Sequence, residues 1–452
     1  MDGKKMGGLG KYLRNSTRPL RRRIGLKQRR EAIVQAFTFL RAKFNRRRAT
    51  GLFIGVTGSS GKSTTVTLLS YLLKQAGSTE AQVYFNTFPE LCRFLACLKP
   101  EVNFVPVEVG IGKVGSMMPM ARLLRPKVVI VTQVGIEHYA SFRGREGVAA
   151  EKSHLVAILP SDGLAILNAD DPYVMAMANR TEARIVTFGW SSDADYRVVD
   201  ARSGLPHKLS LTITCARGTF DIDTPFIADS FWLATAAAFA AAVELGVEPT
   251  VAADAIGTSV APWSRSGLLE IDGGPKFIVD CRKAPADSIP NSVAPLHKAK
   301  NVHRRVILGQ LADYKGSSQR AYRTAYKAVR AAADEVILVG DNIHKVRPSE
   351  EDKQEGKFRS FYTIREVSDH IHDTAQPNDL ILLKSSGTMH MERIALSWTH
   401  NVQCWEERCG KSLDCLQCGM VEVPYQQHGT MRRASRAAKI RRWMPRLRWP
   451  LG

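Results

Sequence analysis

The sequence predicts an α/β protein with two parallel sheets, each covered by helices on both faces. Short apolar runs alternate with helical stretches along most of the chain, which is the pattern of strand–helix–strand units. The runs that carry this prediction lie at residues 104–109, 127–132, 165–167, 276–280, 305–308, 335–339 and 380–383. A chain of 452 residues is also too long for one compact core, so we expect two or more domains.

Local patterns predict the remaining elements. Ile33, Val34, Phe37, Leu40 and Phe44 recur at helical spacing and predict an amphipathic helix near the N-terminus. Helices are expected at 29–45, 63–75, 234–245 and 318–333, a strand from residue 51, and antiparallel strands with turns over 185–225.

These elements divide the chain into five segments. They are a basic N-terminal segment with the amphipathic helix (1–50), a central domain (51–262), a second α/β domain (263–400), a cysteine-rich segment (401–430) and a basic tail that contains tryptophan (431–452). The domain boundary is expected near Pro262, shortly before the second alternating pattern begins.

The net charge of +21 is concentrated at the two ends of the chain. Residues 1–50 hold sixteen Lys and Arg against two acidic residues, and residues 431–452 hold eight basic residues and no acid. The remaining 40 basic and 41 acidic side chains leave the body close to neutral. The basicity therefore belongs to the tails, and the charge of the body gives no sign of nucleic-acid binding.

The sequence has no apolar run of the roughly 20 residues that a membrane-spanning helix needs. The N-terminus also lacks the apolar stretch of a secretory signal. We therefore expect a cytoplasmic protein, in which thiols are kept reduced. The eight cysteines are then free thiols or metal ligands.

The strongest motif lies between the strand at residue 51 and the helix that follows it. Its residues are Thr57, Gly58, Ser59, Ser60, Gly61, Lys62, Ser63 and Thr64. Glycines let backbone N–H groups approach phosphate oxygens, and the N-terminus of the helix adds a favourable dipole. Lys62 would neutralise phosphate charge and the Ser63 hydroxyl would bind Mg²⁺. The sequence thus predicts a P-loop that binds ATP.

The spacing of this loop differs from the common form, because Val56 stands where that form has glycine. The loop resembles that of the Mur ligases, the cytosolic enzymes that add amino acids to peptidoglycan precursors, and of the related folylpolyglutamate and cyanophycin synthetases. The resemblance covers about residues 51–395, is densest at 52–172, and is nearest to the branch that adds D-alanyl-D-alanine. It implies a P-loop, doubly wound central domain and a Rossmann-like C-terminal α/β domain.

Further motifs of the central domain carry the resemblance, at residues 107–110, 131–138, 146–152 and 168–172. They imply that Glu108 holds a magnesium ion, that His138 binds a second metal ion and that Lys152 is carbamylated. Asn168 and Asp170 would lie on the adenine side of ATP. Arg265 is similar to an arginine of the family that faces ATP, displaced by two or three residues.

The chemistry of these side chains fits such roles. Hard oxygen ligands such as Glu108 and Ser63 suit Mg²⁺. Histidine alone is an unusual ligand for this ion, so His138 taken singly would be structural, and Lys152 taken singly could be a solvated charge on a helix. A carbamate on Lys152 would supply the anionic oxygens that an ammonium group lacks.

The second domain keeps part of the resemblance. Residues 383–392, which include Lys384, resemble a signature of the D-alanyl-D-alanine-adding branch. Asp280 begins a second motif whose central residues are replaced here at 281–286. The resemblance implies that this domain closes over the nucleotide through Asp280 and Lys384 and presents the amine. The replacements leave two interpretations: a site retuned for another substrate, or nucleotide binding without ligation.

Two features bear on the substrate. Only 50 residues precede the phosphate loop, whereas Mur ligases typically place a UDP-sugar-binding domain there. We therefore expect a substrate other than the usual UDP-MurNAc-peptide. Arg282 and Lys283 replace polar residues of the family motif and would favour an acidic group on one substrate.

Cys404, Cys409, Cys415 and Cys418 lie within fifteen residues. Four thiolates can close a tetrahedral Zn²⁺ site and stabilise a short segment that has little core. We expect a structural zinc ion here, with free thiols or redox chemistry as the alternatives.

The C-terminal tail interleaves basic residues with Trp443, Met444, Leu447 and Trp449. Such a stretch could lie on an anionic membrane surface, and the basic N-terminal run offers a second weak anchor. Binding of RNA or DNA through phosphates, or a disordered solubilising tail, are the alternatives.

Together these motifs predict an ATP-dependent ligase that uses Mg²⁺ and joins a small-molecule or peptide carboxylate to an amine through an acyl phosphate. The residues expected to carry the reaction are Lys62, His138, Lys152, Asp280 and Lys384. A nucleotide-binding regulatory or assembly protein and a nucleic-acid-stimulated ATPase are the alternative functions.

Overall fold

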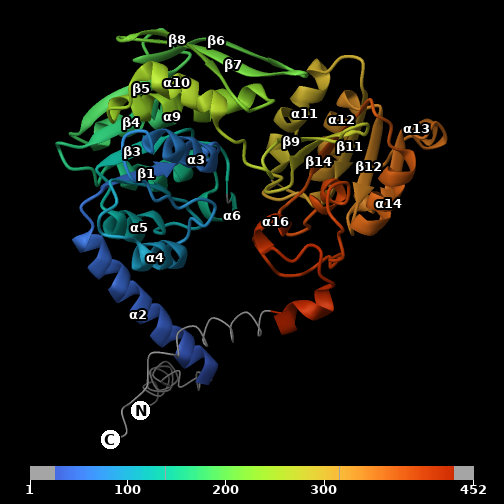
Figure 1. The fold of residues 1–452 in the computed structure, drawn as a ribbon, viewed down its shortest axis with the longest axis horizontal. Coiled ribbons are helices and arrows are strands. Elements are labelled where there is room, and N and C mark those ends of the chain that lie inside the picture. The colour runs from blue at the N-terminus through green and yellow to red at the C-terminus, as the bar shows by residue number, and fades with distance from the viewer. Residues whose placement is uncertain (1–25, 138, 315, 432–452) are drawn as a thin grey trace, which may run out of the picture.

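The computed structural model describes residues 26–137, 139–314 and 316–431. These residues form two sheets that lie beside each other, with a helix projecting from the first (Figure 1). His138, the first 25 residues and the tail after residue 431 lie outside the described residues, so what the sequence predicts for them stays a prediction.

The first sheet has eight strands in the order β2-β1-β3-β4-β5-β6-β7-β8. The strands are β1 (Leu52–Thr57), β2 (Phe104–Glu108), β3 (Val128–Val131), β4 (Leu164–Asn168), β5 (Arg184–Gly189), β6 (Tyr196–Gly204), β7 (His207–Cys215) and β8 (Gly218–Asp223). Pairing is parallel from β2 to β6, and β6, β7 and β8 form an antiparallel meander.

The second sheet has six strands in the order β13-β12-β11-β14-β10-β9. The strands are β9 (Gly267–Glu270), β10 (Lys276–Asp280), β11 (His303–Leu308), β12 (Glu335–Val339), β13 (Phe358–Phe361) and β14 (Asp379–Lys384). All pairs are parallel except that of the edge strand β9 with β10.

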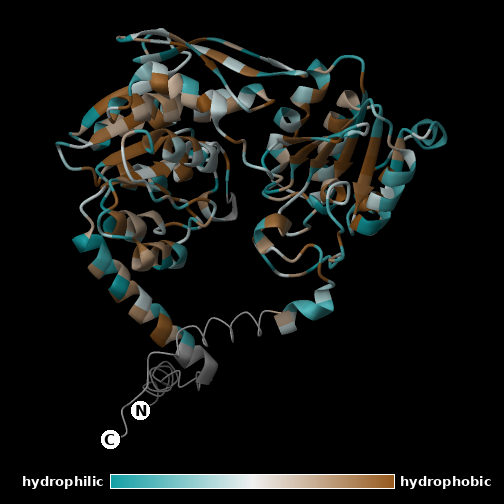
Figure 2. Cartoon of the chain, in the orientation of Figure 1, coloured by the Kyte–Doolittle hydropathy of each residue, from teal (hydrophilic) through white to brown (hydrophobic). Residues whose placement is uncertain are grey.

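Helices cover both faces of each sheet, because the central strands are apolar on both sides and need cover on both. On the first sheet, α3 (Lys62–Leu73), α9 (Trp232–Glu244) and α10 (Pro249–Thr258) pack in one core cluster. The opposite face is covered by α4 (Phe88–Cys97), α5 (Met117–Leu124) and α7 (Arg145–Val156). Figure 2 shows the apolar strands between these layers.

The second sheet is covered in the same way. The helices α11 (Ile289–Lys298) and α12 (Ser318–Ala332) pack on one face, and α14 (Ile364–Thr374) and α15 (Arg393–Leu396) on the other. Two doubly wound sheets confirm the predicted α/β class. The boundary expected near Pro262 falls between α10 and β9, and the domain limits stay a prediction.

Short helices complete the chain. They are α6 (Tyr139–Phe142), α8 (Pro172–Met175), α13 (Glu350–Gln354) and α16 (Cys415–Cys418). The last of these belongs to the cysteine-rich segment, which adds no strand to either sheet.

The prediction of antiparallel strands over 185–225 was wrong for its first strand. β5 pairs with β4 in parallel, because the short helix α8 and the turn over Ala176–Arg180 carry the chain back across the sheet. Only β6 to β8 form the expected meander.

The predicted N-terminal helix is α2 (Leu26–Arg48), and only its C-terminal part packs on the body (Figure 1). Ala42 is fully buried there, and the Asn45 amide donates to the carbonyls of Leu95 and Ala96 in α4. The other end of the helix projects away from the body.

Candidate active site

A cavity of about 290 Å³ lies where the carboxyl ends of the parallel strands of both sheets face each other. Lys62, Ser63 and Glu108 line it from the first sheet, and Asp280, Lys283 and Lys384 line it from the second. In open α/β sheets, ligands bind at the carboxyl ends of the strands, at the point where the strand order reverses and successive strands are added on opposite sides of the first. β1 lies at such a point, because β2 and β3 flank it.

The loop between β1 and α3 depends on two glycines. Gly58 has φ 145°, and a β-carbon there would lie 1.9 Å from the Thr132 hydroxyl oxygen. Thr132 directly follows β3, and its hydroxyl fixes the loop by donating to the Ser60 carbonyl at 2.5 Å. Gly61 has φ 80° and directly precedes α3. The predicted loop therefore has the left-handed glycine and the helix N-terminus that phosphate binding uses.

Glu108 and Ser63 are brought together by strand register. Val56 pairs with Glu108 across β1 and β2, so this carboxylate lies beside the start of the loop. The Ser63 hydroxyl donates to it at 2.7 Å, and the Tyr84 N–H and the Asn86 amide donate at 2.9 and 2.7 Å.

The charge state of Glu108 follows from these contacts. Burial alone would raise the pKa of the carboxyl, but the Lys62 ammonium, the hydrogen bonds from Ser63 and Tyr84, and Arg265 outweigh it and hold the pKa below its usual value. Glu108 is therefore a buried, ionised carboxylate beside a hydroxyl.

Lys152 lies on α7 with no exposed surface, which excludes a solvated lysine at this position. Its ammonium nitrogen lies 2.5 Å from a Glu137 carboxylate oxygen, so the two side chains form a buried ion pair. Burial and the neighbouring Lys62 lower the pKa of Lys152 to about 8, although Glu137 acts in the opposite direction.

Glu137 is a site residue that the sequence reasoning did not single out. Burial raises its pKa, but Lys62 and Lys152 overcome this and bring the pKa to about 2. Its oxygen also accepts a hydrogen bond from Ser59 at 3.2 Å. The only sequence signal was its place in the 131–138 motif, directly before His138, which lies outside the described residues.

In the second sheet, Asp280 and Lys384 occupy paired positions at the ends of β10 and β14. The Lys384 ammonium donates to the Asp280 carboxylate at 2.6 Å and to the Lys283 carbonyl at 3.0 Å. The Ser292 hydroxyl also donates to Asp280, at 3.1 Å. The two predicted residues therefore form a buried ion pair that holds the loop after β10.

Two more cations face the cavity. The Lys62 ammonium, burial and Arg265 together lower the pKa of Lys283 to about 8, despite Glu108 and Glu137. Arg265 approaches the Ser63 hydroxyl at 3.5 Å from the segment between the two sheets.

Arg282, in contrast, is engaged elsewhere. Its guanidinium lies 4.9 Å from the centre of the Tyr84 ring and donates to the Ser412 carbonyl at 2.5 Å. It is not among the residues that line the cavity. Of the two basic replacements in the sequence, Lys283 is therefore the one placed to meet a substrate.

The predicted adenine-side residues have structural contacts. The Asn168 side-chain oxygen accepts from the Asp170 N–H at 3.0 Å, and the Asp170 carboxylate accepts from the backbone N–H groups of Trp190 and Ser191. Neither residue lines the cavity. Their contact with adenine stays a prediction.

Several buried polar atoms at this site have no hydrogen-bond partner among the described residues. They include the Thr57 hydroxyl and the Arg265 Nε, of which only Arg265 lines the cavity. Buried polar groups are nearly always satisfied in folded proteins, so the Arg265 Nε indicates that the cavity takes a polar ligand. Glu108 and the Ser63 hydroxyl are hard oxygen donors of the kind that Mg²⁺ prefers, and they fit the ion that the family implies.

The four clustered cysteines line one small cavity of about 10 Å³, together with His390 and His428. None of the eight cysteines is in a disulfide. Among the described residues, ligand atoms that come within 4.8 Å of one another belong to His390, Glu392 and Cys415. Zinc at the cysteines stays a prediction.

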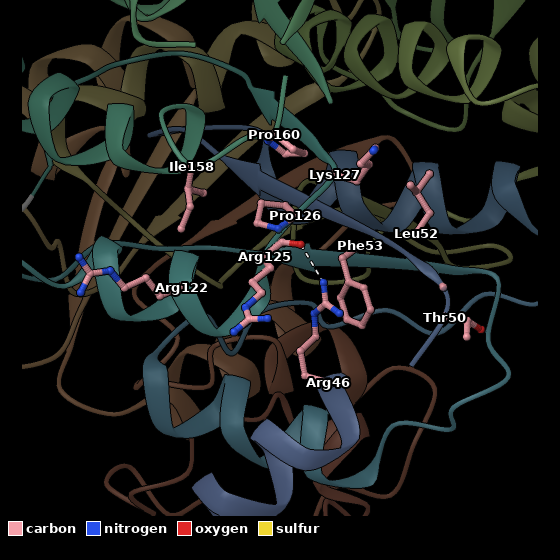
Figure 3. A pocket seen from close by; sticks show the side chains of 11 residues that line it. Arg46, Thr50, Leu52, Phe53, Arg122, Arg125, Pro126, Lys127, Ile158 and Pro160 are labelled. Carbon is pink, nitrogen blue, oxygen red and sulfur yellow. Dashed lines mark hydrogen bonds between the residues drawn. The ribbon is translucent and has the colours of Figure 1, made fainter. Parts of the chain in front are cut away.

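A larger cavity, of about 750 Å³, lies at the other end of β1 (Figure 3). Thr50 and Leu52 line it beside Arg46, Arg122 and Arg125, close to the amino end of the strand. It contains none of the loop, carboxylate or lysine residues described above. Although this cavity is larger, it is therefore not the candidate catalytic site.

Comparison with known proteins relates the central part of the chain to a family. Residues 56–242 match the model of the Mur ligase middle domain. UDP-N-acetylmuramoyl-tripeptide–D-alanyl-D-alanine ligase of Rickettsia prowazekii (strain Madrid E) is 23% identical over 359 residues, which cover 78% of this chain and 79% of that protein. The enzyme of the same name from Bacillus subtilis (strain 168) is 25% identical over 350 residues, covering 75% and 74%.

A solved structure has the same fold. MurF from Acinetobacter baumannii superimposes with a TM-score of 0.72 at 20% identity, covering 80% of each chain. Residues 56–242 therefore form a Mur ligase middle domain, and the two relatives named above are Mur ligases that add D-alanyl-D-alanine.

Proposed function

We propose that this protein is an ATP-dependent ligase that joins a carboxylate to an amine through an acyl phosphate, on a substrate other than UDP-MurNAc-peptide. The observation that carries the proposal is the convergence of three cations, Lys62, Arg265 and Lys283, on one cavity beside the glycine loop. Such a concentration of positive charge is expensive to hold together unless a polyanion occupies it. ATP and an acyl phosphate are polyanions of this kind.

The reaction needs two transfers. A carboxylate oxygen attacks the γ-phosphorus, and the bond from that phosphorus to the β-phosphate oxygen breaks and releases ADP. An amine nitrogen then attacks the acyl carbon, phosphate leaves and the nitrogen loses a proton to give the amide. Lys62 and Lys283 stabilise the negative charge that develops in both steps, which is the main demand that phosphoryl transfer makes on a protein.

The other side chains position the groups that react. Glu108 and Ser63 would hold Mg²⁺, which screens phosphate charge when bound. The Asp280–Lys384 pair fixes the loop that carries Lys283, so this cation stays directed at the cavity. Because Lys283 replaces a polar family residue, we propose an acidic group on the amine or carboxylate substrate.

Lys152 would be carbamylated, as the family resemblance implies. Its lowered pKa leaves a larger neutral fraction than an ordinary lysine has, and only the neutral amine reacts with carbon dioxide. Lys62 and Lys283 lie near enough to compensate the additional negative charge beside Glu137.

The test is phosphate release from ATP with a panel of carboxylates and amines, measured on the full chain and on Lys62→Ala. The proposal expects release only with a matching pair, and none with Lys62→Ala. Nucleotide binding without release under any pair would favour the regulatory or assembly protein. Release stimulated by RNA or DNA alone would favour the nucleic-acid-stimulated ATPase.

We also propose that α2 attaches the protein to an anionic membrane surface. Ile33, Phe37, Leu40 and Phe44 lie along one stripe of this helix and are between 57% and 69% exposed. Among the described residues, no helix is both long and apolar enough to cross a membrane. An exposed apolar stripe on a basic helix is typical of surface binding instead.

The cavities at the base of α2 extend this basic surface. Arg46, Arg122 and Arg125 line both the 750 Å³ cavity of Figure 3 and a neighbouring one of about 340 Å³. The Arg46 guanidinium lies 3.7 Å from the centre of the Phe53 ring and donates to the Arg125 carbonyl at 2.8 Å. The exposed Arg122 and Arg125 would face lipid headgroups once the stripe is inserted, whereas Arg46 is held by these protein contacts.

Flotation with phosphatidylcholine vesicles, with and without phosphatidylglycerol, tests the attachment. We expect binding only to the anionic vesicles, weakened by salt and lost in the double variant Phe37→Glu, Leu40→Glu. Val260→Glu is the matched control, because Val260 is 81% exposed and lies away from α2. Equal binding by the control and the double variant would count against the proposal.

A further inference from the structure

The cysteine-rich segment has very little core of its own. Its buried apolar cluster consists of Leu396, Val402, Cys415 and Val421, with two tryptophans packed beside them. Regular structure among its described residues is limited to the four residues of α16, one turn over Tyr425–Gln427 and the start of a helix at His428. A segment of this size normally needs a cross-link or a metal ion to hold one conformation.

All four cysteines of the segment line the same small cavity, although they come from three separate stretches and no three of their sulfur atoms lie within 4.8 Å of one another in this structure. Cys404 lies in an extended strand-like stretch that bonds to Val421, Cys409 lies in the following loop, and Cys415 and Cys418 form one turn of helix. Cys409 and Cys418 are each followed by a glycine in the left-handed conformation, with φ 67° and 66°. The two glycines turn the chain at matching points beside the cavity.

Two nitrogen donors point at these sulfur atoms. The Lys411 ammonium donates to the Cys418 sulfur at 2.8 Å. The His390 Nε2 lies 3.1 Å from the Cys409 sulfur, and its Nδ1 lies 3.3 Å from the Glu392 carboxylate. Hydrogen bonds to sulfur favour thiolates, and a cluster of thiolates without such donors or a metal ion would repel itself.

A mixed ligand set is the competing arrangement. The ligand atoms of His390, Glu392 and Cys415 lie within 4.8 Å of one another. Glu392, however, already accepts the Cys415 N–H at 3.0 Å and faces the His390 ring. A carboxylate that faces the far nitrogen of a histidine ring is the usual second layer around a metal site, so Glu392 orients the His390 ring and is not itself a ligand.

We propose that this cavity is a structural Zn²⁺ site with Cys404, Cys409, Cys415 and Cys418 as its four ligands and with His390 and Lys411 as hydrogen-bond donors to their sulfur atoms. One zinc ion displaces four thiol protons to solvent and forms four bonds to sulfur. Four protein ligands leave no open coordination position, so the ion has a structural role and not a catalytic one.

The zinc-bound segment also braces the active site. The Arg282 guanidinium donates to the Ser412 carbonyl between Cys409 and Cys415, and Arg282 directly precedes Lys283. From the other side, Arg393 is fully buried and donates to the carbonyls of Cys404 and Glu406. Loss of the ion would therefore loosen the loop that holds Lys283, whether or not the proposed ligation takes place.

Metal analysis of the purified full chain tests the ligand set. We expect about one zinc per chain, a loss of at least about tenfold in Cys404→Ser and Cys418→Ser, and an unchanged content in Cys97→Ser. Cys97 is an exposed thiol of α4 and serves as the matched control. His390→Ala should keep the ion with weaker affinity.

Cobalt substitution of the wild-type chain keeps the test independent of variants that fail to fold. Four thiolates give intense sulfur-to-cobalt absorption and tetrahedral d–d bands, which we expect here. A chain with no zinc and no cobalt spectrum overturns the site. The competing outcome is a zinc content that is lost in His390→Ala but kept in Cys404→Ser and Cys418→Ser. That result overturns the proposed ligand set in favour of His390, Glu392 and Cys415.

Hydrogen exchange of the wild-type chain tests the brace. After removal of the ion with a chelator, we expect faster exchange at the backbone amides of residues 281–284. Exchange in β1 of the first sheet, and in α3 that packs on it, should not change. Unchanged exchange at residues 281–284 would contradict the claim that the zinc-bound segment stabilises this loop. It would not affect the test of zinc binding itself.

Discussion

At the scale of single residues, Lys62 is the sharpest test of the phosphate loop. Its ammonium donates to the Gly58 carbonyl and is buried at the cavity. Bonds from an ammonium to phosphate are worth about 1.5–3 kcal/mol, so Lys62→Ala should weaken ATP binding by about 10- to 100-fold. Calorimetric titration measures this.

The control for this experiment is Lys74→Ala. Lys74 is exposed at the other end of α3, so the substitution removes the same charge from the same helix without touching the loop. Equal affinities of the two variants for ATP would contradict the assigned loop.

Lys152 gives a prediction in pH. With a pKa of about 8, roughly a tenth of its side chains are neutral at pH 7 and half at pH 8, against well under a thousandth at pH 7 for an ordinary lysine. The neutral, reactive form increases as the pH rises, and the lowered pKa places this increase between about pH 7 and 9. Carbamate formed from ¹³C-bicarbonate should therefore increase from pH 7 to 9, as seen by NMR.

Lys152→Arg is the control, since it keeps the positive charge and cannot form the carbamate. A carbamate signal that is equal in this variant would assign the modification to another lysine. No signal at any pH in the wild-type chain would remove carbamylation from the proposed function.

Single residues were partly predictable from the sequence. The loop, Glu108, Asp280 and Lys384 could be placed because each belongs to a motif tied to the end of a strand. Glu137 could not be singled out, because its role arises only when α7 brings Lys152 against it.

At the scale of elements, the pairing of β10 with β14 makes Asp280 and Lys384 one unit. Removing one partner of a buried ion pair leaves the other charge unpaired. We expect Lys384→Met to lower the free energy of unfolding by about 3 kcal/mol, and Asp280→Asn combined with it to recover much of that loss. Urea unfolding of the four chains of this double-mutant cycle gives the coupling energy.

The coupling should differ clearly from zero, because Ser292 and the Lys283 carbonyl share the same network. Additive effects of the two substitutions would mean that solvent screens the pair. In that case the loop after β10 is held by other contacts.

The elements themselves were predictable where the pattern is long. The helix over 318–333 and the strands at 276–280 and 335–339 lie where the sequence places them. The edge strands β9 and β13 were missed, because each has only four residues and at most one that is fully buried. An apolar signal is weak in such strands.

At the scale of the whole molecule, the cavity is shared between two sheets that have separate cores. We expect two unfolding transitions by calorimetry without nucleotide. ATP at a hundred times its dissociation constant stabilises the bound state by about 2.7 kcal/mol and, by contacting both sheets, should move the transitions together. At the same ATP concentration Lys62→Ala should gain only about 0.4–1.4 kcal/mol, so its two transitions should move together less than those of the wild-type chain.

A shift confined to the first transition would place the nucleotide on one sheet alone. The sequence could not predict this shared cavity. It follows from how two independently folded sheets pack, and no local pattern in either half encodes that arrangement.

The meander β6–β8 has a consequence for motion. Leu205, in the turn between β6 and β7, packs against the core of the second sheet, and Asp229 after β8 forms an ion pair with Lys298 of α11. The two halves are thus fastened twice, by this strap and by the chain between α10 and β9 (Figure 1). Because both connections join the same two sheets, we expect product release to widen the angle between the sheets while the contact of Leu205 with the second core is kept.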